Sequence, residues 1–317
     1  MFRRCLCCLG PLKARDVDYD KRCLDVLFDG QPLVNRINLA RSAPSTAKLL
    51  SISGVQEKKA IVLDGGILRL AQKGELSHFF AKPIGLSEHK KMTLMPANEH
   101  LSMQLAWQVF GIEVATNALI RVGEGDFAYL CKRYDLIGEQ RLKQEDFAAL
   151  LGKTSATDGT FYKYKGSYLE LFEVLREVPT YKIESRKLFE LIVFNYLISN
   201  GDAHLKNFAL LERQTGDYGL SPAFDLLNTR LHIEDKTFAL DGLLPAELRK
   251  GKVKAQFYKL ADLAALPISW VNRCFKRFLS EGVNQRVEAL VNSSFLDEKT
   301  KRQYIQLFQS RRNKLLR

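Results

Sequence analysis

A strongly apolar segment that runs directly into a polar loop constrains this chain more than any other feature. Between Lys187 and Ser199, eight positions carry large apolar side chains: Leu188, Phe189, Leu191, Ile192, Val193, Phe194, Leu197 and Ile198. A helix that is apolar over most of its circumference belongs in the core of a folded domain. The next residues, 199–208, read Ser-Asn-Gly-Asp-Ala-His-Leu-Lys-Asn-Phe. Polar residues this dense at the end of a core helix predict a loop that projects into a cleft.

The polar loop contains an aspartate and an asparagine at an informative spacing. Asp202 and Asn207 lie five positions apart, as do the Asp and Asn of a kinase catalytic loop. In such a loop the aspartate accepts or orients the proton of the substrate hydroxyl, and the asparagine holds Mg²⁺. Lys206 between them could neutralise charge that develops on a transferred phosphoryl group. Downstream, Asp225 supplies a second hard oxygen ligand of the kind that ATP-bound Mg²⁺ prefers.

Upstream features fit the same chemistry. Residues 50–58 read Leu-Ser-Ile-Ser-Gly-Val-Gln-Glu-Lys, and a turn rich in Ser and Gly can direct backbone N–H groups at phosphates. Lys82 ends an apolar strand, where burying its charge is costly unless a phosphate and a carboxylate compensate. Glu99, on the following predicted helix, is the candidate carboxylate.

Each of these residues also has an ordinary structural explanation. The polar loop could merely cap a turn, Lys82 could be a surface residue at a strand end, and Asp225 could form an Asx turn. Together they occur in the order of a kinase: phosphate loop, lysine, glutamate, hinge, Asp–Asn pair and second Asp.

The predicted elements divide the chain into three parts. Residues 1–45 contain four cysteines and scattered charge, and they show no clear periodicity. Residues 46–137 read as a small antiparallel sheet with one helix at 98–110, and the strands are at 59–63, 67–70, 77–82, 118–122 and 127–133. Residues 138–317 are mostly helical, and one of these helices is predicted at 145–151. This order predicts an α/β (α+β) protein of two lobes, a small β-rich N-lobe and a larger helical C-lobe around a cleft.

The formal net charge of the 317 residues is +12, which raises the question of a nucleic-acid partner. The charge is dispersed, so we interpret it mainly as a solvated surface that also favours ATP or an acidic protein. A nucleic-acid-binding protein is the alternative from a different class, although we expect no direct contact with DNA. The only basic and aromatic cluster that could stack bases consists of Tyr162, Lys163, Tyr164, Lys165 and Tyr168. A role of this segment in docking a substrate or a loop is an equal alternative.

No apolar run approaches the ~18–20 residues that span a bilayer, so the sequence predicts no membrane segment. The N-terminus is basic and then apolar, but it is too short for a signal peptide. We therefore expect a cytoplasmic protein.

The residues named above belong to longer motifs, and together these resemble the HipA family of serine/threonine kinases. The family motifs and their positions here are S-x-x-G-x-Q-x-K at 51–58, N-E at 98–99, R-[FY]-D at 133–135, Q-E-D-[FM] at 144–147, D-x-H-x-K-N-F at 202–208 and P-x-[YF]-D at 222–225. The resemblance covers roughly residues 50–241 and is loose in the C-terminal helices. It implies a two-lobed protein-kinase-like fold that binds ATP and Mg²⁺.

The resemblance also implies roles for the matching residues. Asp202 would be the catalytic base, Asn207 and Asp225 would bind Mg²⁺, and Glu99 would form an ion pair with the strand lysine. The residues implied to contact ATP are Ser53, Gly54, Val55, Gln56, Glu57, Lys58, Lys82, Lys132, Arg133, Tyr134, His204, Leu205, Lys206, Asn207, Phe224 and Asp225. The hinge that contacts the adenine would consist of Lys132, Arg133 and Tyr134. Ser51 and Ser53 would be autophosphorylated.

The chain departs from longer family members ahead of its Ser-rich loop. Those members carry an additional N-terminal subdomain there, whereas only about fifty residues precede the loop here. This looks like the short HipT-type toxins of tripartite toxin–antitoxin systems, in which that subdomain is a separate small protein. The resemblance implies a toxin that phosphorylates a protein, such as an aminoacyl-tRNA synthetase, and that binds a small subdomain-like antitoxin and a DNA-binding antitoxin. A small-molecule kinase on the same fold is a further alternative.

Cysteines near the N-terminus have the spacing of a metal knuckle. Cys5, Cys8 and Cys23 resemble an N-terminal zinc-knuckle-like segment of some HipA relatives, which have His at the position of Asp20. Three thiolates and a carboxylate are an uncommon ligand set for Zn²⁺. We therefore expect reduced, unliganded thiols, and a Zn²⁺ site formed by these four residues is the alternative.

Overall fold

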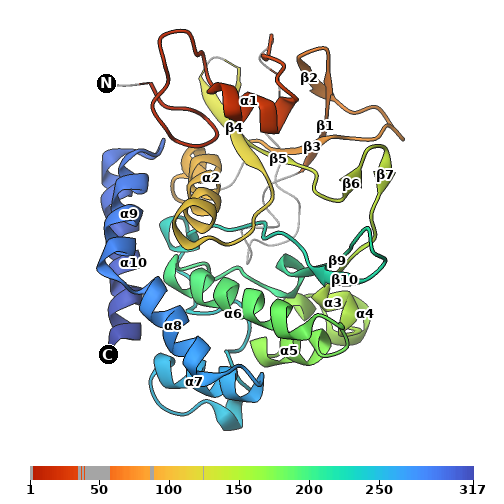
Figure 1. Ribbon diagram of the computed structural model, residues 1–317. Coiled ribbons are helices and arrows are strands. Elements are labelled where there is room, and N and C mark those ends of the chain that lie inside the picture. The colour runs from red at the N-terminus through yellow and green to blue at the C-terminus, as the bar shows by residue number, and fades with distance from the viewer. Residues whose placement is uncertain (1–2, 35–36, 38, 40–57, 86–88, 124) are drawn as a thin grey trace.

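A β-rich part and a helical part lie one above the other in the molecule (Figure 1). The computed structural model describes residues 3–34, 37, 39, 58–85, 89–123 and 125–317. Within them, strands dominate the first half and helices the second, which confirms the predicted mixed α/β class. The predicted limits of the three parts, after residues 45 and 137, stay predictions.

One antiparallel sheet of five strands forms the β-rich part, in the order β2-β1-β3-β5-β4. The strands are β1 (Lys59–Asp64), β2 (Ile67–Leu70), β3 (Phe79–Lys82), β4 (Asn117–Val122) and β5 (Asp126–Lys132). Gly65 and Gly66 join β1 to β2 with φ angles of 55° and 81°. Two consecutive positive φ angles give the tight hairpin turn that glycine allows. In the sheet, Lys82 of β3 pairs with Tyr129 of β5, so the lysine lies on a central strand.

Two helices flank this sheet, α1 (Lys21–Phe28) above it and α2 (Met95–Leu105) below it in Figure 1. Helix α2 is buried along its whole length and continues as a π-helical turn, Ala106–Phe110, until Gly111 ends it with a φ of 70°. Helix α1 corrects the prediction that residues 1–45 are irregular. It begins because the Asp20 side chain accepts a hydrogen bond from the Cys23 N–H, and its apolar face is buried.

The central helix of the lower part is α6 (Tyr181–Leu197), the apolar segment that the sequence places in the core. The other helices of this half of the chain are α3 (Phe147–Leu150), α4 (Ser155–Asp158), α5 (Tyr168–Leu175), α7 (Val253–Leu263), α8 (Ile268–Phe278), α9 (Glu281–Asn292) and α10 (Glu298–Leu316). Of these, α9 packs beside α2 and against α10 (Figure 1). Two small sheets complete the lower part, formed by β6 (Leu136–Ile137) with β7 (Gln140–Arg141), and by β8 (Gln144–Asp146), β9 (Ala209–Glu212) and β10 (Tyr218–Leu220). Among the described helices, none has the length and hydropathy to cross a membrane.

The start of α3 differs from the helix predicted at 145–151. Gln144–Asp146 pair with β9 as strand β8, and the helix begins only at Phe147. Asp146 accepts a hydrogen bond from the Ala149 N–H at 3.0 Å, so its side chain caps the helix from outside.

An aromatic cluster joins the two parts through Phe110 at the end of the π-helical turn. Its ring centroid lies 5.0 Å from that of Phe194, 4.9 Å from that of Phe278 and 6.3 Å from that of Phe308. These partners belong to α6, α8 and α10. Helix α2 is therefore packed against the helical core at the same time as against the sheet.

Candidate active site

A cavity of about 270 Å³ lies where the sheet meets the loop that carries Asp225. Strands β3 and β5 form one wall, and the segment that follows β10 forms another. Its lining residues are Lys58, Phe80, Lys82, Glu99, Tyr129, Cys131, Lys132, Arg133, Tyr134, Asp135, Arg141, Gln144, Phe224 and Asp225. Eight of these lining residues have a role that the family resemblance implies: seven are predicted nucleotide contacts, and the eighth is Glu99.

Lys82 is the cation at the centre of the cavity. It is 9% exposed, and its Nζ donates to Glu99 Oε1 at 2.7 Å and also to Asp225 Oδ1. Lys58 Nζ approaches the other oxygen of the same aspartate at 3.6 Å. Burial lowers the pKa of the Lys82 ammonium, and the carboxylate of Glu99 opposes that effect. The two lysines therefore place positive charge where an anionic ligand would enter.

Asp225 is held at the cavity by an unusual backbone and a buried anchor. Its φ angle of 59° lies in the left-handed region, which non-glycine residues adopt only when their surroundings impose it. Just before it, Ala223 donates to the Glu113 carbonyl and accepts from the Ala115 N–H, both at 2.9 Å. This pairing ties the segment to the chain between α2 and β4.

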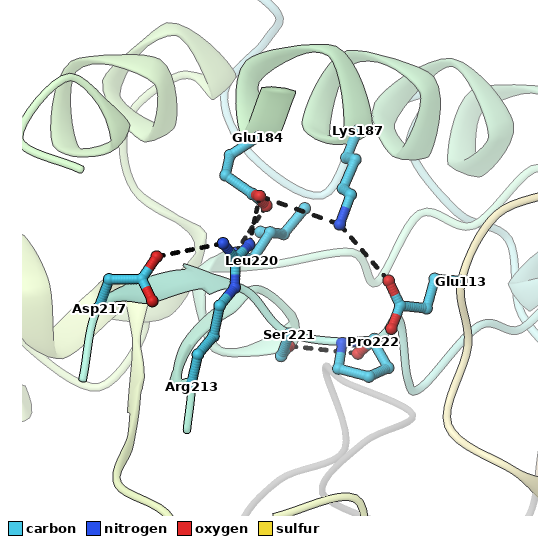
Figure 2. Close-up of polar contacts among 8 residues, drawn as sticks. All are labelled: Glu113, Glu184, Lys187, Arg213, Asp217, Leu220, Ser221 and Pro222. Atoms are coloured by element: carbon cyan, nitrogen blue, oxygen red, sulfur yellow. Dashed lines mark hydrogen bonds and ion pairs between the residues drawn. The ribbon is translucent and has the colours of Figure 1, made fainter. Parts of the chain in front are cut away.

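Figure 2 shows the anchor of that segment. Glu184 of α6 is fully buried, and its carboxylate accepts from Arg213 and from the Leu220 N–H, the latter at 2.9 Å. Lys187 lies between Glu184, at 3.9 Å, and Glu113, at 3.5 Å. The core helix thereby fixes the end of β10, five residues before Asp225.

The polar loop after α6 forms a second group of candidate residues, outside the wall of the cavity. Asp202 is 7% exposed and accepts a hydrogen bond from the Tyr164 hydroxyl at 2.6 Å. Asn207 Nδ2 donates to the Asp202 carbonyl at 2.9 Å, so the two residues at the five-residue spacing are joined directly. Asn200 Nδ2 reaches the Asp225 carbonyl at 3.5 Å and connects this loop to the first group.

The other residues of this loop have distinct environments. Burial, with nearby Lys163, lowers the pKa of His204 to about 3, so its imidazole is neutral at physiological pH. Leu205 is completely buried, which means that only its backbone could meet a nucleotide. Lys206 is partly exposed and pairs with Asp146 at 2.9 Å, and this carboxylate raises the pKa of the lysine.

The predicted basic and aromatic cluster packs against the polar loop. Tyr168 is buried and donates to the Ala203 carbonyl at 2.8 Å, while Tyr164 contacts Asp202 and stacks edge-on with His204. Rings used in this way do not form the exposed stacking surface that the nucleic-acid alternative needs.

The predicted hinge combines backbone pairing with an ion-pair cluster. Lys132 and Arg133 donate their N–H groups to the carbonyls of Thr116 and His78, at 2.8 and 2.9 Å. The Arg133 side chain binds Asp135 through both carboxylate oxygens, and Asp135 also accepts from Arg141 at 3.1 Å.

Two side chains next to the hinge have roles that no short motif reveals. Lys132 extends to α1, where its Nζ donates to the Val26 carbonyl at 2.9 Å. Tyr134 stacks with Phe224, with ring centroids 6.1 Å apart, and forms a flat apolar surface in the cavity.

Part of the predicted phosphate loop lies outside the described residues: Ser51, Ser53, Gly54, Val55, Gln56 and Glu57. Lys58, the last residue of its motif, is described and lines the cavity.

Several residues that complete the two groups had no individual predicted role in the site. They are Asn200, Asp146, Tyr164, Glu184, Arg141 and Phe80, the last lying under the Arg133 guanidinium at 4.6 Å from the ring centroid. Asp146 belongs to a family motif, Asn200 to the polar loop and Tyr164 to the basic and aromatic cluster. The contacts of Tyr164 and Glu184 join residues 38 and 29 positions apart, so no local pattern signals them.

Sequence comparison connects this geometry to a family. Residues 50–291 match the HipA-like C-terminal domain. A protein of Sinorhizobium fredii named "Putative kinase Y4mE" is 32% identical over 189 residues, which cover 57% of this chain and 42% of that protein. A protein of Haemophilus influenzae named "Putative kinase" is 25% identical over 243 residues, 71% of this chain and 68% of that protein. The chain thus spans less than half the length of the first relative.

Two solved structures share the fold. HipA of Shewanella oneidensis MR-1, in complex with HipB and its operator DNA, aligns with a TM-score of 0.66 at 19% identity, over 97% of this chain and 74% of that one. The Helicobacter pylori proinflammatory kinase CtkA aligns with a TM-score of 0.54 at 12% identity, over 87% of this chain and 95% of that one. These likenesses confirm the predicted kinase-like fold. Since the family match covers well over half of the sequence, the chain belongs to the family of the HipA-like C-terminal domain.

Proposed function

We propose that the chain is a serine/threonine protein kinase that transfers the γ-phosphoryl group of ATP to a protein. The contact of one buried lysine with both Glu99 and Asp225 carries the proposal. Kinases need such a lysine on a sheet strand, paired with a helix glutamate, beside the aspartate that holds the metal. A lysine buried for structural reasons alone would need no cavity, yet Lys82 and its partners line one.

The donor atoms also fit ATP-bound Mg²⁺. Asp225 and Asn207 offer carboxylate and amide oxygens, which are the hard ligands that this cation prefers. When bound, Mg²⁺ would neutralise charge on the phosphates. In our proposal Lys82 orients the phosphates, and the stacked Tyr134 and Phe224 rings supply the apolar surface for the adenine.

Asp202 accepts the proton of the substrate hydroxyl as the phosphoryl group is transferred. The hydrogen bond from Tyr164 fixes one carboxylate oxygen of Asp202 and thereby its orientation. Lys206, partly exposed beside the loop, contributes positive charge near the transferred group. The neutral His204 supports the loop through packing rather than through proton transfer.

We further propose that the kinase is the toxin of a toxin–antitoxin system. Support comes from the family match and from the fold shared with the HipA that was solved with HipB and operator DNA. A small subdomain-like antitoxin and a DNA-binding antitoxin would be its partners. An aminoacyl-tRNA synthetase is the proposed substrate, and Ser51 and Ser53 are the proposed autophosphorylation sites.

A phosphorylation assay separates this function from its alternatives. The purified chain is incubated with Mg²⁺ and γ-labelled ATP, alone and with cell extract. We expect label on the chain itself, mapped by mass spectrometry to Ser51 or Ser53, and on a protein of the extract. Label only in small molecules would identify a small-molecule kinase. No transfer under either condition would contradict the kinase proposal and favour a binding protein.

A further inference from the structure

A cluster of three thiols and a carboxylate lies in the N-terminal segment, apart from the nucleotide cavity. Its members are Cys5, Cys8, Asp20 and Cys23, and one ligand atom from each lies within 4.8 Å of all the others. Cys5 and Cys23 are buried, and the other two are partly buried. All three cysteines are free thiols.

The backbone builds this cluster from two short pieces. The first is a tight turn in which Cys5 N–H donates to the Gly10 carbonyl at 2.8 Å and Leu9 N–H donates to the Cys5 carbonyl at 3.1 Å. Leu9 has a φ angle of 63°, which closes the turn in the left-handed region. The second piece is the start of α1, where Asp20 and Cys23 occupy the N-cap and the first turn.

Asp20 is oriented as a ligand by its capping role. Its Oδ1 accepts the Cys23 N–H at 2.9 Å, and its Oδ2 lies 3.1 Å from Cys8 Sγ and 3.5 Å from Cys23 Sγ. One oxygen is thus used by the backbone, while the other faces the thiols. Ligands of metal sites are commonly fixed by such outer hydrogen bonds.

The size and chemistry of the cluster suit a tetrahedral soft-metal site. With Zn–S bonds of about 2.3 Å, the sulfurs of a tetrahedral site lie about 3.8 Å apart. The present separations, at most 4.8 Å, need a contraction of about 1 Å, which side-chain rotation supplies. A disulfide would use only two of the three thiols, whereas a tetrahedral metal ion would use all three together with the carboxylate.

The surroundings compensate the negative charge that three thiolates and a carboxylate bring. The hollow beside the cluster is lined by the basic residues Lys13, Arg15, Lys21 and Arg22. The cluster also faces the N-terminus of α1, whose free N–H groups favour anions. Cys7, between the first two ligands, donates its N–H toward Cys5 Sγ at 3.5 Å.

We propose that Cys5, Cys8, Asp20 and Cys23 form a structural Zn²⁺ site that fastens the N-terminal segment onto helix α2 and strand β4. The turn between the first two ligands presents its carbonyls to both elements. Leu6 accepts from the Leu119 N–H at 2.8 Å, and Cys8 accepts from Gln108 Nε2 at 2.9 Å. The Cys7 carbonyl lies 2.7 Å from Nε2 of His100, the residue after Glu99.

Metal analysis of the full chain, purified without chelators under reducing conditions, tests this site. We expect one Zn²⁺ per chain. After exchange, Co²⁺ should show thiolate-to-metal charge-transfer absorption and the visible bands of tetrahedral coordination. Neither readout depends on kinase activity.

Three variants distinguish ligation from folding. Removing an outer-shell partner lowers metal affinity by about 10–100-fold. Cys8→Ser removes a direct ligand, so its zinc affinity should fall by more than that. Asp20→Asn keeps an oxygen for the helix cap but weakens the ligand, so zinc should bind less tightly while the metal-free protein unfolds at an unchanged temperature. Cys274→Ser, on α8 and outside the cluster, should bind zinc as the native chain does.

Two results would overturn the site. One is a folded, reduced chain that contains no zinc and binds neither Zn²⁺ nor Co²⁺. The other is zinc binding that Cys8→Ser and Asp20→Asn leave unchanged, because the metal would then lie elsewhere.

Discussion

Lys82 is the residue at which burial and charge are most closely balanced. Burial of the ammonium lowers its pKa and the carboxylate of Glu99 opposes that effect, while Asp225 forms a second ion pair with it. A buried charge that loses its partner is costly, so this site depends on all three residues being present. The proposed nucleotide would add phosphate oxygens to the same cation.

Replacing Glu99 with Gln should shift the pH dependence of nucleotide binding. Burial already lowers the pKa of Lys82 below its ordinary value of 10.5, and Glu99 opposes this. Without the carboxylate charge the pKa falls further, so the alkaline limit of ATP binding should move to lower pH. The folded state binds the proton of such a lysine less tightly than the unfolded chain does. The cost of burying the charged lysine is therefore fully present below the folded pKa and is lost as pH rises from the folded pKa to the unfolded value of 10.5. Binding titrations with a fluorescent ATP analogue over a pH series measure the shift, and an unchanged alkaline limit would contradict it.

Asp202→Asn should separate catalysis from binding. The amide cannot accept the proton of the substrate hydroxyl, so phosphoryl transfer should fall on the order of 10²-fold or more while ATP affinity changes little. Single-turnover transfer of labelled phosphate and equilibrium ATP binding are measured on the same preparation. Asp262→Asn is a matched control, because that side chain is 72% exposed and forms an ion pair with Lys259 of α7. Native-like transfer by the Asp202 variant would remove the base from our proposal.

At the residue scale, the sequence predicted which residues belong to the site better than it predicted their contacts. The pairing of Lys82 with Glu99 and the closeness of Asp202 to Asn207 follow from strand, helix and loop spacing, which are local. The hydrogen bond from Tyr164 was not predictable, since the folding of two separate segments creates it.

Among the elements, α6 and β10 determine where Asp225 lies. Glu184 accepts hydrogen bonds from the β10 backbone and from Arg213, so the helix holds the strand from which the Asp225 segment departs (Figure 2). The helix itself was predictable from its apolar residues. Its one buried carboxylate was not, because its partners lie beyond the polar loop.

Glu184→Gln should destabilise the protein at the anchor of the segment that carries Asp225. The amide can still accept from the Leu220 N–H, but it loses the charge that pairs with Arg213. A hydrogen bond to a charged group contributes about 1.5–3 kcal/mol, and we expect the free energy of unfolding to fall by about that amount. Urea denaturation measures the loss. Glu113→Gln, in the same network but 61% exposed, should change it by less than about 0.5 kcal/mol. Equal effects of the two variants would show that the buried anchor has no special role.

Two elements show where local patterns mislead. Residues 144–146 have the composition of a helix start, yet they pair with β9 as a strand, and only the Asp146 cap belongs to the helix. Helix α1 has just two turns, too few for a periodicity that stands out from the sequence around it. Packing against the sheet stabilises this helix; for example, the ring centroids of Phe28 and Phe79 lie 5.7 Å apart.

At the scale of the whole molecule, an edge of the sheet in the β-rich part is the candidate docking surface. Strand β2 is the edge of the five-stranded sheet as described, and edge strands leave backbone N–H and carbonyl groups available for pairing. Ile67 and Leu70 on this strand are 45% and 49% exposed, and Val34, whose N–H donates to the Gly66 carbonyl, is 69% exposed. An apolar rim beside an open edge is typical of a surface that another protein covers.

We therefore predict that a separate small protein, the proposed subdomain-like antitoxin, docks on the β-rich part along β2. The net charge of +12 favours an acidic partner through electrostatic steering. A double variant, Ile67→Lys with Leu70→Lys, should weaken co-purification from the native operon at least tenfold, since it places two charges in an apolar contact. Ile268→Lys on α8, 61% exposed in the helical part, is the control and should leave the complex intact. If the native chain purifies alone as a stable monomer, and neighbouring gene products neither bind it nor alter its toxicity, the edge of β2 is no docking site and the described N-terminal segment completes this lobe unaided.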